Sequence, residues 1–178
     1  AIARAAALRG AEVTLVSGPV GLEAPAGVKR VPITSAHDLF EAVTAVSEQQ
    51  DIIIKAAAVA DYRPASVSDE KIKKADNDLS IALERTEDTL QYLGSHKPEG
   101  QILCGFAMET SDLENRARAK LHKKNLNMIV ANNVKVAGAG FGTDTNVVTF
   151  ITAEKTEQME IMSKDQVAMR LLDRLASM

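Results

Sequence analysis

The stretch DIIIKAAA, residues 51–58, constrains the fold of this chain more than any other part of the sequence. It is a nearly continuous apolar run with three consecutive isoleucines, not an alternation of apolar and polar residues. Such a run is typical of a strand that is covered on both faces, as strands are in parallel sheets flanked by helices. We therefore expect residues 51–58 to form a buried strand of a parallel sheet.

Other segments alternate between strand-like and helix-like patterns. Residues 36–50 place Leu39, Val43 and Val46 at helical spacing, and Ser35 precedes them as an N-cap. The remaining expected strands are residues 12–17, 28–33, 79–83, 101–106 and 126–131, and the remaining expected helices are residues 87–96 and 112–124. This alternation predicts an α/β fold with a doubly wound, mostly parallel, Rossmann-like sheet and helices on both faces.

The C-terminal part has a different pattern. The stretch TNVVTFITAEKTEQMEIMS predicts two strands joined by a charged turn, that is, a β-hairpin. The following stretch spaces Val167, Leu171, Leu172 and Leu175 along one face of an amphipathic helix. Because 178 residues suffice for one core and no linker interrupts them, residues 1–178 are expected to form a single domain.

The first residues predict a helix that begins without a capping residue. Residues 1–8 are mostly alanine and leucine, and Gly10 is typical of a helix C-terminus. In a βαβ unit, such a helix follows a strand and a phosphate-facing loop. We expect that this domain, as the chain presents it, lacks its N-terminal strand and a glycine-rich loop.

Charge and hydropathy exclude some classes of protein. The formal net charge is −3, whereas nucleic-acid-binding domains usually carry a basic excess. No run of about 18 apolar residues predicts a membrane-spanning helix, and no signal peptide opens the chain. We expect a cytoplasmic protein that binds neither nucleic acid nor membrane.

Cysteine and histidine usage argues against some kinds of site. Cys104 is the only cysteine, so no intramolecular disulfide forms, and its apolar surroundings favour a buried core residue over a nucleophile. The three histidines, His37, His96 and His122, lack metal-ligand spacing, so no metal site is predicted. The chain also lacks a Walker-type loop and a nucleophile elbow.

Polar residues follow several of the expected strands, where open α/β sheets bind ligands. Asp61 comes just after the 51–58 run, and the segment EKIKKAD follows it with three lysines in four positions. Phe106 ends a third strand, and Lys120 and Lys124 share one face of the next helix. Lysines suit phosphate or carboxylate ligands, but solvated surface lysines and an ordinary strand exit remain alternative interpretations of these patterns.

In family order, the motifs RGAEVTLVSGPV, AAAVADYRP, EKIKK, GFAMET, ANN and FGTDTN cover nearly the whole chain. Together they resemble the phosphopantothenoylcysteine synthetase family, in its bacterial form. The resemblance implies a ligase that uses CTP, with Mg²⁺, to activate 4′-phosphopantothenate as an acyl-cytidylate before L-cysteine attacks. It also implies a homodimer, with the lysine segment near the subunit interface, and a fusion to a flavin-dependent decarboxylase in the full-length protein.

The resemblance also implies which residues form the site. Lys71 is the expected catalytic residue, and the segment TEDTL takes the place of an NPDI-like stretch of the family. The implied nucleotide-binding residues are Lys55, Ala56, Ala57, Asp61, Lys71, Glu87, Asp88, Thr89, Leu90, Phe106, Lys120 and Lys124.

Two other functions remain open on the sequence. A nucleotide-dependent oxidoreductase could use a similar sheet, and its mark would be a glycine fingerprint followed by a ribose-binding acid. A non-catalytic nucleotide-binding or dimerisation module is the other alternative. Binding of CTP, of NADPH or of neither distinguishes the three.

Overall fold

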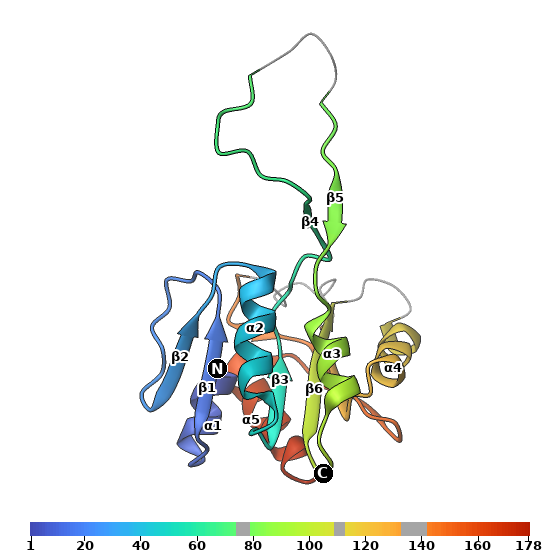
Figure 1. The fold of residues 1–178 in the computed structure, drawn as a ribbon. Helices are drawn as coiled ribbons and strands as arrows, with labels where there is room; N and C mark the ends of the chain where they lie inside the picture. The colour runs from blue at the N-terminus through green and yellow to red at the C-terminus, as the bar shows by residue number, and fades with distance from the viewer. Residues whose placement is uncertain (74–78, 109–112, 133–141) are drawn as a thin grey trace.

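A computed structural model describes residues 1–73, 79–108, 113–132 and 142–178 (Figure 1). The helices are α1 (Ile2–Leu8), α2 (Ala36–Ser47), α3 (Thr89–His96), α4 (Leu113–Lys123) and α5 (Lys164–Leu175). The strands are β1 (Val13–Ser17), β2 (Val28–Pro32), β3 (Ile52–Lys55), β4 (Tyr62–Pro64), β5 (Leu83–Arg85), β6 (Ile102–Met108), β7 (Met128–Asn132), β8 (Thr145–Asn146), β9 (Val148–Ile151), β10 (Thr156–Gln158) and β11 (Met162–Ser163).

The central sheet has five strands in the order β10-β9-β7-β6-β3. Strands β3, β6 and β7 are parallel, and β9 and β10 join as antiparallel neighbours. Strands β1 and β2 pair in parallel as a separate two-stranded sheet. The expected mixed α/β fold with a parallel-rich sheet is confirmed, but the expected single sheet is divided between two parts.

Helices cover both faces of the central sheet because successive residues of a strand point to opposite faces. Leu103 of β6 packs with residues of α3 and α4. Cys104, the next residue, packs on the other face with Leu171 and Leu175 of α5. All three of these α5-side residues are 0% exposed. The predicted amphipathic C-terminal helix is therefore confirmed.

Helix α2 begins where the sequence indicates. The Ser35 hydroxyl accepts a hydrogen bond from the Asp38 amide, and the Asp38 carboxylate accepts one from the Ser35 amide. This capping box satisfies backbone donors of the first turn. The helix ends at Ser47, earlier than the expected residue 50.

The expected strand 51–58 is wrong in its length and in its burial. Strand β3 covers only Ile52–Lys55, and residues 56–58 are exposed. Its pairing with β6 ends at Lys55 and Gly105, and within the described residues no strand pairs with its other edge. The expected strand 79–83 is also misplaced, since β5 is Leu83–Arg85 and is exposed. The sequence predicted a buried run where the structure has a half-covered edge.

Residues 62–73 and 79–85, here called the arm, extend away from the body of the molecule (Figure 1). At its base, β4 and β5 pair as antiparallel strands, and Arg63 and Glu84 form an ion pair at 2.7 Å. The described part of the arm exposes large apolar side chains, namely Tyr62, Val67, Ile72, Leu79, Ile81 and Leu83. The arm therefore has no hydrophobic core of its own among the described residues.

The C-terminal region consists of short antiparallel strands. Strand β10 pairs with β9 beyond the connecting residues 152–155, and β11 pairs with β8.

At Cys104, burial raises the pKa of the thiol to about 12, so the prediction of an unreactive core cysteine is confirmed. Among the residues that the structure describes, no helix is long and apolar enough to cross a membrane.

Candidate functional site

Lys55 is the last residue of β3 and lies where the chain turns from the body toward the arm. Its ammonium group donates a hydrogen bond to the carbonyl oxygen of Ala57 at 3.1 Å. Burial lowers the pKa of Lys55, and the charge of Lys124 lowers it further, whereas Asp88 and Asp61 oppose the shift. The structure thus gathers two cations and two carboxylates at the carboxyl end of β3.

Asp88 connects this cluster to helix α3. Its carboxylate accepts a hydrogen bond from the Gln91 amide at 3.1 Å and so caps the helix. The ammonium of Lys124 approaches the same carboxylate at 2.8 Å. Burial alone would raise the pKa of Asp88, but the hydrogen bonds from Lys124 and from the Gln91 amide outweigh it, and the pKa lies below its ordinary value. Asp88 is therefore held as an anion between a cation and a helix N-terminus.

Glu87 forms a second ion pair beside the first. Its Oε1 lies 2.8 Å from Nδ1 of His37, which belongs to the first turn of α2. The hydrogen bond with Glu87, reinforced by the charge of Glu41, raises the pKa of His37. The other oxygen of Glu87, Oε2, is buried without a hydrogen-bond partner among the described residues. This pair fastens the start of α2 to the segment that returns from the arm.

The base of the arm is held by hydrogen bonds of Thr86. Its hydroxyl donates to the carbonyl of Ala60 at 2.6 Å, and its amide donates to the carbonyl of Asp61 at 3.0 Å. Both contacts join the chain that enters the arm to the chain that leaves it. They fix the backbone of Asp61 next to the Glu87–Asp88 segment.

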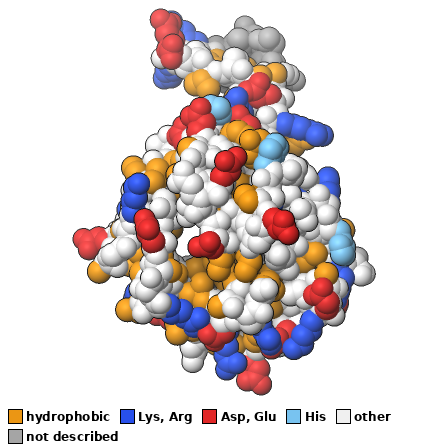
Figure 2. Space-filling view, turned by 60° about the horizontal axis from the view of Figure 1, so that its bottom comes forward, with side chains coloured by type: hydrophobic (Ala, Val, Ile, Leu, Met, Phe, Trp, Pro, Cys, Tyr) orange, Lys and Arg blue, Asp and Glu red, His pale blue; other side chains and the backbone are white. Residues whose placement is uncertain are grey.

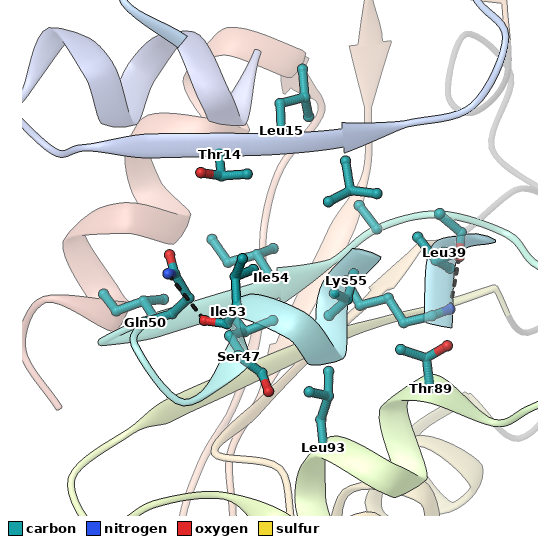
Figure 3. Close-up of a pocket in the computed structure, with 16 residues that line it drawn as sticks. Thr14, Leu15, Leu39, Ser47, Gln50, Ile53, Ile54, Lys55, Thr89 and Leu93 are labelled. Atoms are coloured by element: carbon teal, nitrogen blue, oxygen red, sulfur yellow. Dashed lines mark hydrogen bonds between the residues drawn. The ribbon is translucent and has the colours of Figure 1, made fainter. Parts of the chain in front are cut away.

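A cavity of about 260 Å³ begins beside this cluster. Lys55, Ala56, Ala57 and Thr89 form one end of its lining, and the rest comes mainly from apolar residues of β1, α2 and β3. Figure 3 shows β1 and β3 on opposite sides of the cavity, with Ile53 and Ile54 of β3 pointing away from each other. The charged cluster therefore lies at the mouth of an apolar space, and it is not enclosed within it.

A family model described as DNA/pantothenate metabolism flavoprotein C-terminal domain matches residues 1–178. The chain belongs to this family. The coenzyme A biosynthesis bifunctional protein CoaBC of Bacillus subtilis (strain 168) is 49% identical over 180 residues, which cover 100% of this chain and 44% of that protein. The chain thus spans less than half the length of this curated relative. The predicted family resemblance is confirmed.

Solved structures of relatives have the same fold. The C-terminal domain of a coenzyme A biosynthesis bifunctional protein CoaBC matches with a TM-score of 0.83 and 40% identity, covering 99% of this chain and 79% of that chain. A Cab2 mutant in complex with phosphopantothenate-cysteine matches with a TM-score of 0.65 and 16% identity, covering 85% of this chain and 52% of that chain. At that identity, the second likeness concerns the fold alone.

Of the site residues expected from the family resemblance, several lie together at the base of the arm. These are Lys55, Ala56, Ala57, Asp61, Glu87, Asp88, Thr89 and Lys124. Thr89 and Leu90 are 3% and 8% exposed, and Leu90 belongs to the core under α3. Both residues are therefore almost fully buried, although Thr89 lines one end of the cavity.

Other expected residues lie apart from this cluster. Lys71 is exposed on the arm, and no hydrogen bond or ion pair links it to the rest of the described residues. Phe106 does not end its strand, because β6 continues to Met108, and its half-buried side chain packs in the core on the α5 side. Lys120 is exposed on α4, one turn before Lys124. Lys74, a further lysine of the EKIKKAD segment, lies outside the described residues.

His37 and Thr86 also contact this cluster, and the sequence motifs do not predict either of them. The contact of His37 with Glu87 spans 50 positions of the chain. Nothing local in the sequence indicates that contact. The position of Thr86, directly before two acidic residues and a helix, was the one available signal for its role at the arm base.

The described site residues do not form a metal-binding group. Within the described ranges, no group of three His, Cys, Asp or Glu side chains could hold a metal ion. The cluster instead offers the ammonium groups of Lys55 and Lys124 beside the carboxylate of Asp88, which already caps α3. Ammonium groups of this kind can bind anions.

Proposed function

We propose that this chain is the ligase domain that joins 4′-phosphopantothenate to L-cysteine in coenzyme A biosynthesis, with CTP as the activating nucleotide. Family membership over residues 1–178 supports this proposal, as does 49% identity to a protein named as a coenzyme A biosynthesis enzyme. At the level of the site, two contacts at the carboxyl edge of the sheet carry it: Lys124 pairs with Asp88 at 2.8 Å, and the Lys55 ammonium donates to the Ala57 carbonyl at 3.1 Å.

The proposed reaction has two steps. A carboxylate oxygen of 4′-phosphopantothenate attacks the α-phosphorus of CTP, which forms the acyl-cytidylate and releases pyrophosphate. The amine of cysteine then attacks the acyl carbon, forms the amide bond, loses a proton and displaces CMP. The first step brings two anions together, so cations that offset their repulsion accelerate it.

Lys55 and Lys124 suit this role because both are positively charged and repel each other before an anionic ligand binds. The charge of Lys124 lowers the pKa of Lys55, which means that the two ammonium groups are close enough to repel. Asp88 offsets only part of this repulsion from its place at the cap of α3. A triphosphate placed between them would be favoured by the two cations.

Lys71 is the proposed catalytic residue, and it acts from the arm. The structure leaves its ammonium exposed, away from the Lys55–Lys124 pair. We propose that the arm of one protomer places Lys71 over the phosphates of a bound nucleotide, in its own site or in that of a second copy. Phe106, Leu90 and Lys120 are proposed to contribute at the rim of the nucleotide site, the first two through their backbone.

A homodimer is part of this proposal. Along the described arm, side chains such as Val67 and Leu79 are 84% and 68% exposed, which is more apolar surface than an isolated extension would keep in water. We propose that the arms pack against a second copy. Leu79→Glu together with Leu83→Glu should shift sedimentation from dimer to monomer, whereas Lys29→Glu on β2 should leave it unchanged.

Magnesium is expected to accompany the nucleotide. The described carboxylates do not fit a dedicated magnesium cage, since Asp88 is occupied by Lys124 and Glu87 by His37. Magnesium usually keeps its waters and binds few protein oxygens together with substrate phosphates. We therefore assign it to the nucleotide and to no set of protein ligands.

The remaining parts of the proposal concern the whole protein. We propose that residues 1–178 are one domain with a doubly wound sheet, and that the full-length protein is cytoplasmic and carries a fused flavin-dependent decarboxylase. The naming of the relative as a bifunctional protein, of which this chain matches 44%, supports the fusion.

The test uses the full-length protein and follows pyrophosphate released with CTP, 4′-phosphopantothenate and cysteine. Lys124→Gln should lower kcat/KM by about 100-fold, because one group that stabilises transition-state charge is lost. Lys123→Gln, at the exposed neighbouring position, is the matched control and should stay near the wild-type rate. Equal activity of the two variants would overturn the assignment of Lys124.

Nucleotide binding separates the proposal from its alternatives. Calorimetry should show binding of CTP in preference to ATP and NADPH. Binding of NADPH alone would favour the oxidoreductase. A protein that binds none of the three would be left as an interaction module.

A further inference from the structure

One face of α3 lies against the C-terminal end of α4. Gln91 donates a hydrogen bond from its side-chain amide to the carbonyl oxygen of Lys123 at 3.2 Å. One turn further along α3, a Cβ atom on Gly94 would lie 1.8 Å from the carbonyl oxygen of Lys124, so the two backbones are in direct contact. Residues three positions apart share one face of a helix. The same face begins with Asp88, the N-cap residue that pairs with Lys124.

The chain leaves α4 through a left-handed turn at Asn125, whose φ is 49°. The amide of Asn125 donates to the carbonyl of His122 at 3.2 Å, and the amide of Leu126 donates to the carbonyl of Leu121 at 3.0 Å. These are the two hydrogen bonds of a Schellman motif, whose left-handed position usually belongs to glycine. Among the described residues, Asn125 is the only non-glycine residue with a positive φ.

The side chain of Asn125 links this turn back to α3. Its amide group donates a hydrogen bond to the carbonyl oxygen of Gly94 at 2.9 Å. The backbone carbonyl of Asn125 accepts a hydrogen bond from the Lys97 ammonium at 3.2 Å, and that ammonium also donates to the side-chain oxygen of Asn127 at 2.9 Å. A glycine at position 125 could form the turn, but it could not form the link to Gly94.

These contacts determine where the ammonium of Lys124 lies. The backbone of Lys124 is held on both sides, since the residue before it accepts a hydrogen bond from Gln91 and the residue after it donates one to α3. Its side chain is only 20% exposed, and its ammonium lies 2.8 Å from the Asp88 carboxylate. A lysine side chain has a flexible four-carbon stem, and fixing it costs rotamer entropy. Here α3 holds both the backbone and the ammonium, so the protein itself sets the position of this cation.

The surrounding charge gives an anion little general attraction. Figure 2 shows that acidic and basic side chains are interspersed on one face of the body and form no broad basic patch there. The formal net charge of the chain is −3, so the field of the whole molecule does not favour a negative ligand. Binding of an anion at the base of the arm therefore depends on where individual ammonium groups are held.

We propose that Asn125 is a positioning residue for Lys124 in the ligase reaction, and that Gln91 assists it. The inference rests on the proposed function, in which Lys124 stabilises the charge that develops when CTP is attacked. Asn125 acts through Lys124, because its side chain fixes the turn against α3 and the turn directs the ammonium toward Asp88 and the site. Preorganised charges act only where charge develops, so a displacement of about 1 Å weakens their effect.

Lysine acetylation of the full-length protein, resolved by mass spectrometry, tests the positioning without any nucleotide. Asn125→Gly removes the link to α3 but keeps the turn, since glycine adopts a positive φ without strain. Lys124 should be acetylated several-fold faster in this variant, because its ammonium is no longer held at the Asp88 carboxylate. Lys123 is the internal control and should react at an unchanged rate. Ser95→Ala is the matched control variant, because the Ser95 hydroxyl bonds only within α3.

A double-mutant cycle on CTP-dependent pyrophosphate release tests whether the effect passes through Lys124. Asn125→Gly alone should lower kcat by about 10-fold, with a smaller change in KM for CTP, because transition-state stabilisation is lost. In the Lys124→Gln background, the same substitution should have little further effect, since the two residues act as one unit. Gln91→Ala, which removes the second link, should change acetylation and kcat in the same directions and keeps the test valid if Asn125→Gly does not fold.

The outcomes separate this inference from the proposed function. An unchanged acetylation rate of Lys124 in folded Asn125→Gly would overturn the inference, and so would an equal loss of kcat in the Lys124→Gln background. Faster acetylation of Lys124, in a protein whose wild type releases no pyrophosphate with CTP, would support the positioning by Asn125 and overturn the proposed function instead.

Discussion

The arm and the body contain the same kinds of apolar side chain but use them in opposite ways. Leu83 of the arm is 59% exposed, whereas Leu103 of β6 is 0% exposed between helices and strands. Burial of a leucine contributes about 1.5–3 kcal/mol relative to exposure. The body therefore gains its stability from such residues, and the described arm leaves its apolar surface exposed. An apolar stretch of this sequence indicates burial only where other elements cover it.

Truncation of one leucine in each region tests this difference most strongly. Leu171→Ala in α5 should lower the free energy of unfolding by about 2–5 kcal/mol, because it leaves a cavity in a closed core. Leu83→Ala in the arm should change it by less than about 0.5 kcal/mol. Urea unfolding followed by circular dichroism, at a protein concentration that keeps the chain monomeric, measures both. Similar losses in the two variants would mean that the arm folds against the body.

Gly94 of α3 tests how tightly the body packs beneath the site. A Cβ atom at this position would lie 1.8 Å from the backbone carbonyl oxygen of Lys124. Since backbone must move, Gly94→Ala should destabilise by about 1–3 kcal/mol and displace the ammonium of Lys124 from Asp88. Gly21→Ala, where nothing lies within 4 Å, is the matched control and should be nearly neutral. A neutral Gly94→Ala would show that α3 and the end of α4 are loosely joined.

Asp88 tests the junction between the body and the arm. Asp88→Ala removes the side-chain cap of α3 and should cost about 1 kcal/mol of stability. Asp88→Asn keeps a capping oxygen but removes the charge, and so it should retain most of that stability. Thermal unfolding at pH 7 compares the two variants. If Asp88→Asn loses as much as Asp88→Ala, the ion pair with Lys124 is the dominant stabilising contact.

The smallest expected effect concerns His37 and Glu87 and depends on pH. The folded-state pKa of His37 is raised above 6.5 and that of Glu87 is lowered below 4.5. The contribution of His37 is thus fully present below pH 6.5 and is lost as the pH rises through its folded pKa, and that of Glu87 is lost as the pH falls through its own. The pair contributes most between pH 4.5 and 6.5.

A nuclear magnetic resonance titration of His37 measures this coupling directly. In Glu87→Gln, the pKa of His37 should fall toward its ordinary value, because its charged hydrogen-bond partner is gone. Glu48→Gln, a substitution near the end of α2, should leave the His37 titration unchanged. An unaltered pKa of His37 in Glu87→Gln would show that the contact between the start of α2 and the arm base does not set this pKa.

Local sequence patterns predicted elements whose signals lie within one segment. The capping box at Ser35 and the apolar stripe of α5 are local, and both were placed closely. The strand end at Lys55 and the exposure of residues 56–58 were not predicted, because they depend on how far the neighbouring β6 pairs with β3. The position of β5 in an exposed arm likewise depends on the absence of covering elements among the described residues.

The candidate site shows the same division. Family motifs indicated Lys55, Asp88 and Lys124 as parts of a site, and the structure places these three together. His37 was not predicted, since its partner lies 50 positions away in the chain.

The assignment of Lys71 stays a prediction. In the full-length protein, Lys71→Gln should lose most of the pyrophosphate release, whereas Lys73→Gln should keep most of it.

By itself, the sequence determined the class of fold, the alternation of strands and helices, the unreactive core cysteine and the family. Those properties follow from local periodicity, composition and ordered motifs, which act within short stretches of chain. Only the tertiary structure decided which apolar residues are covered, which charges meet at the base of the arm, and that β1 and β3 leave matching edges unpaired. Burial, ion pairing and strand pairing each need a partner from a distant segment, and a linear pattern does not specify that partner.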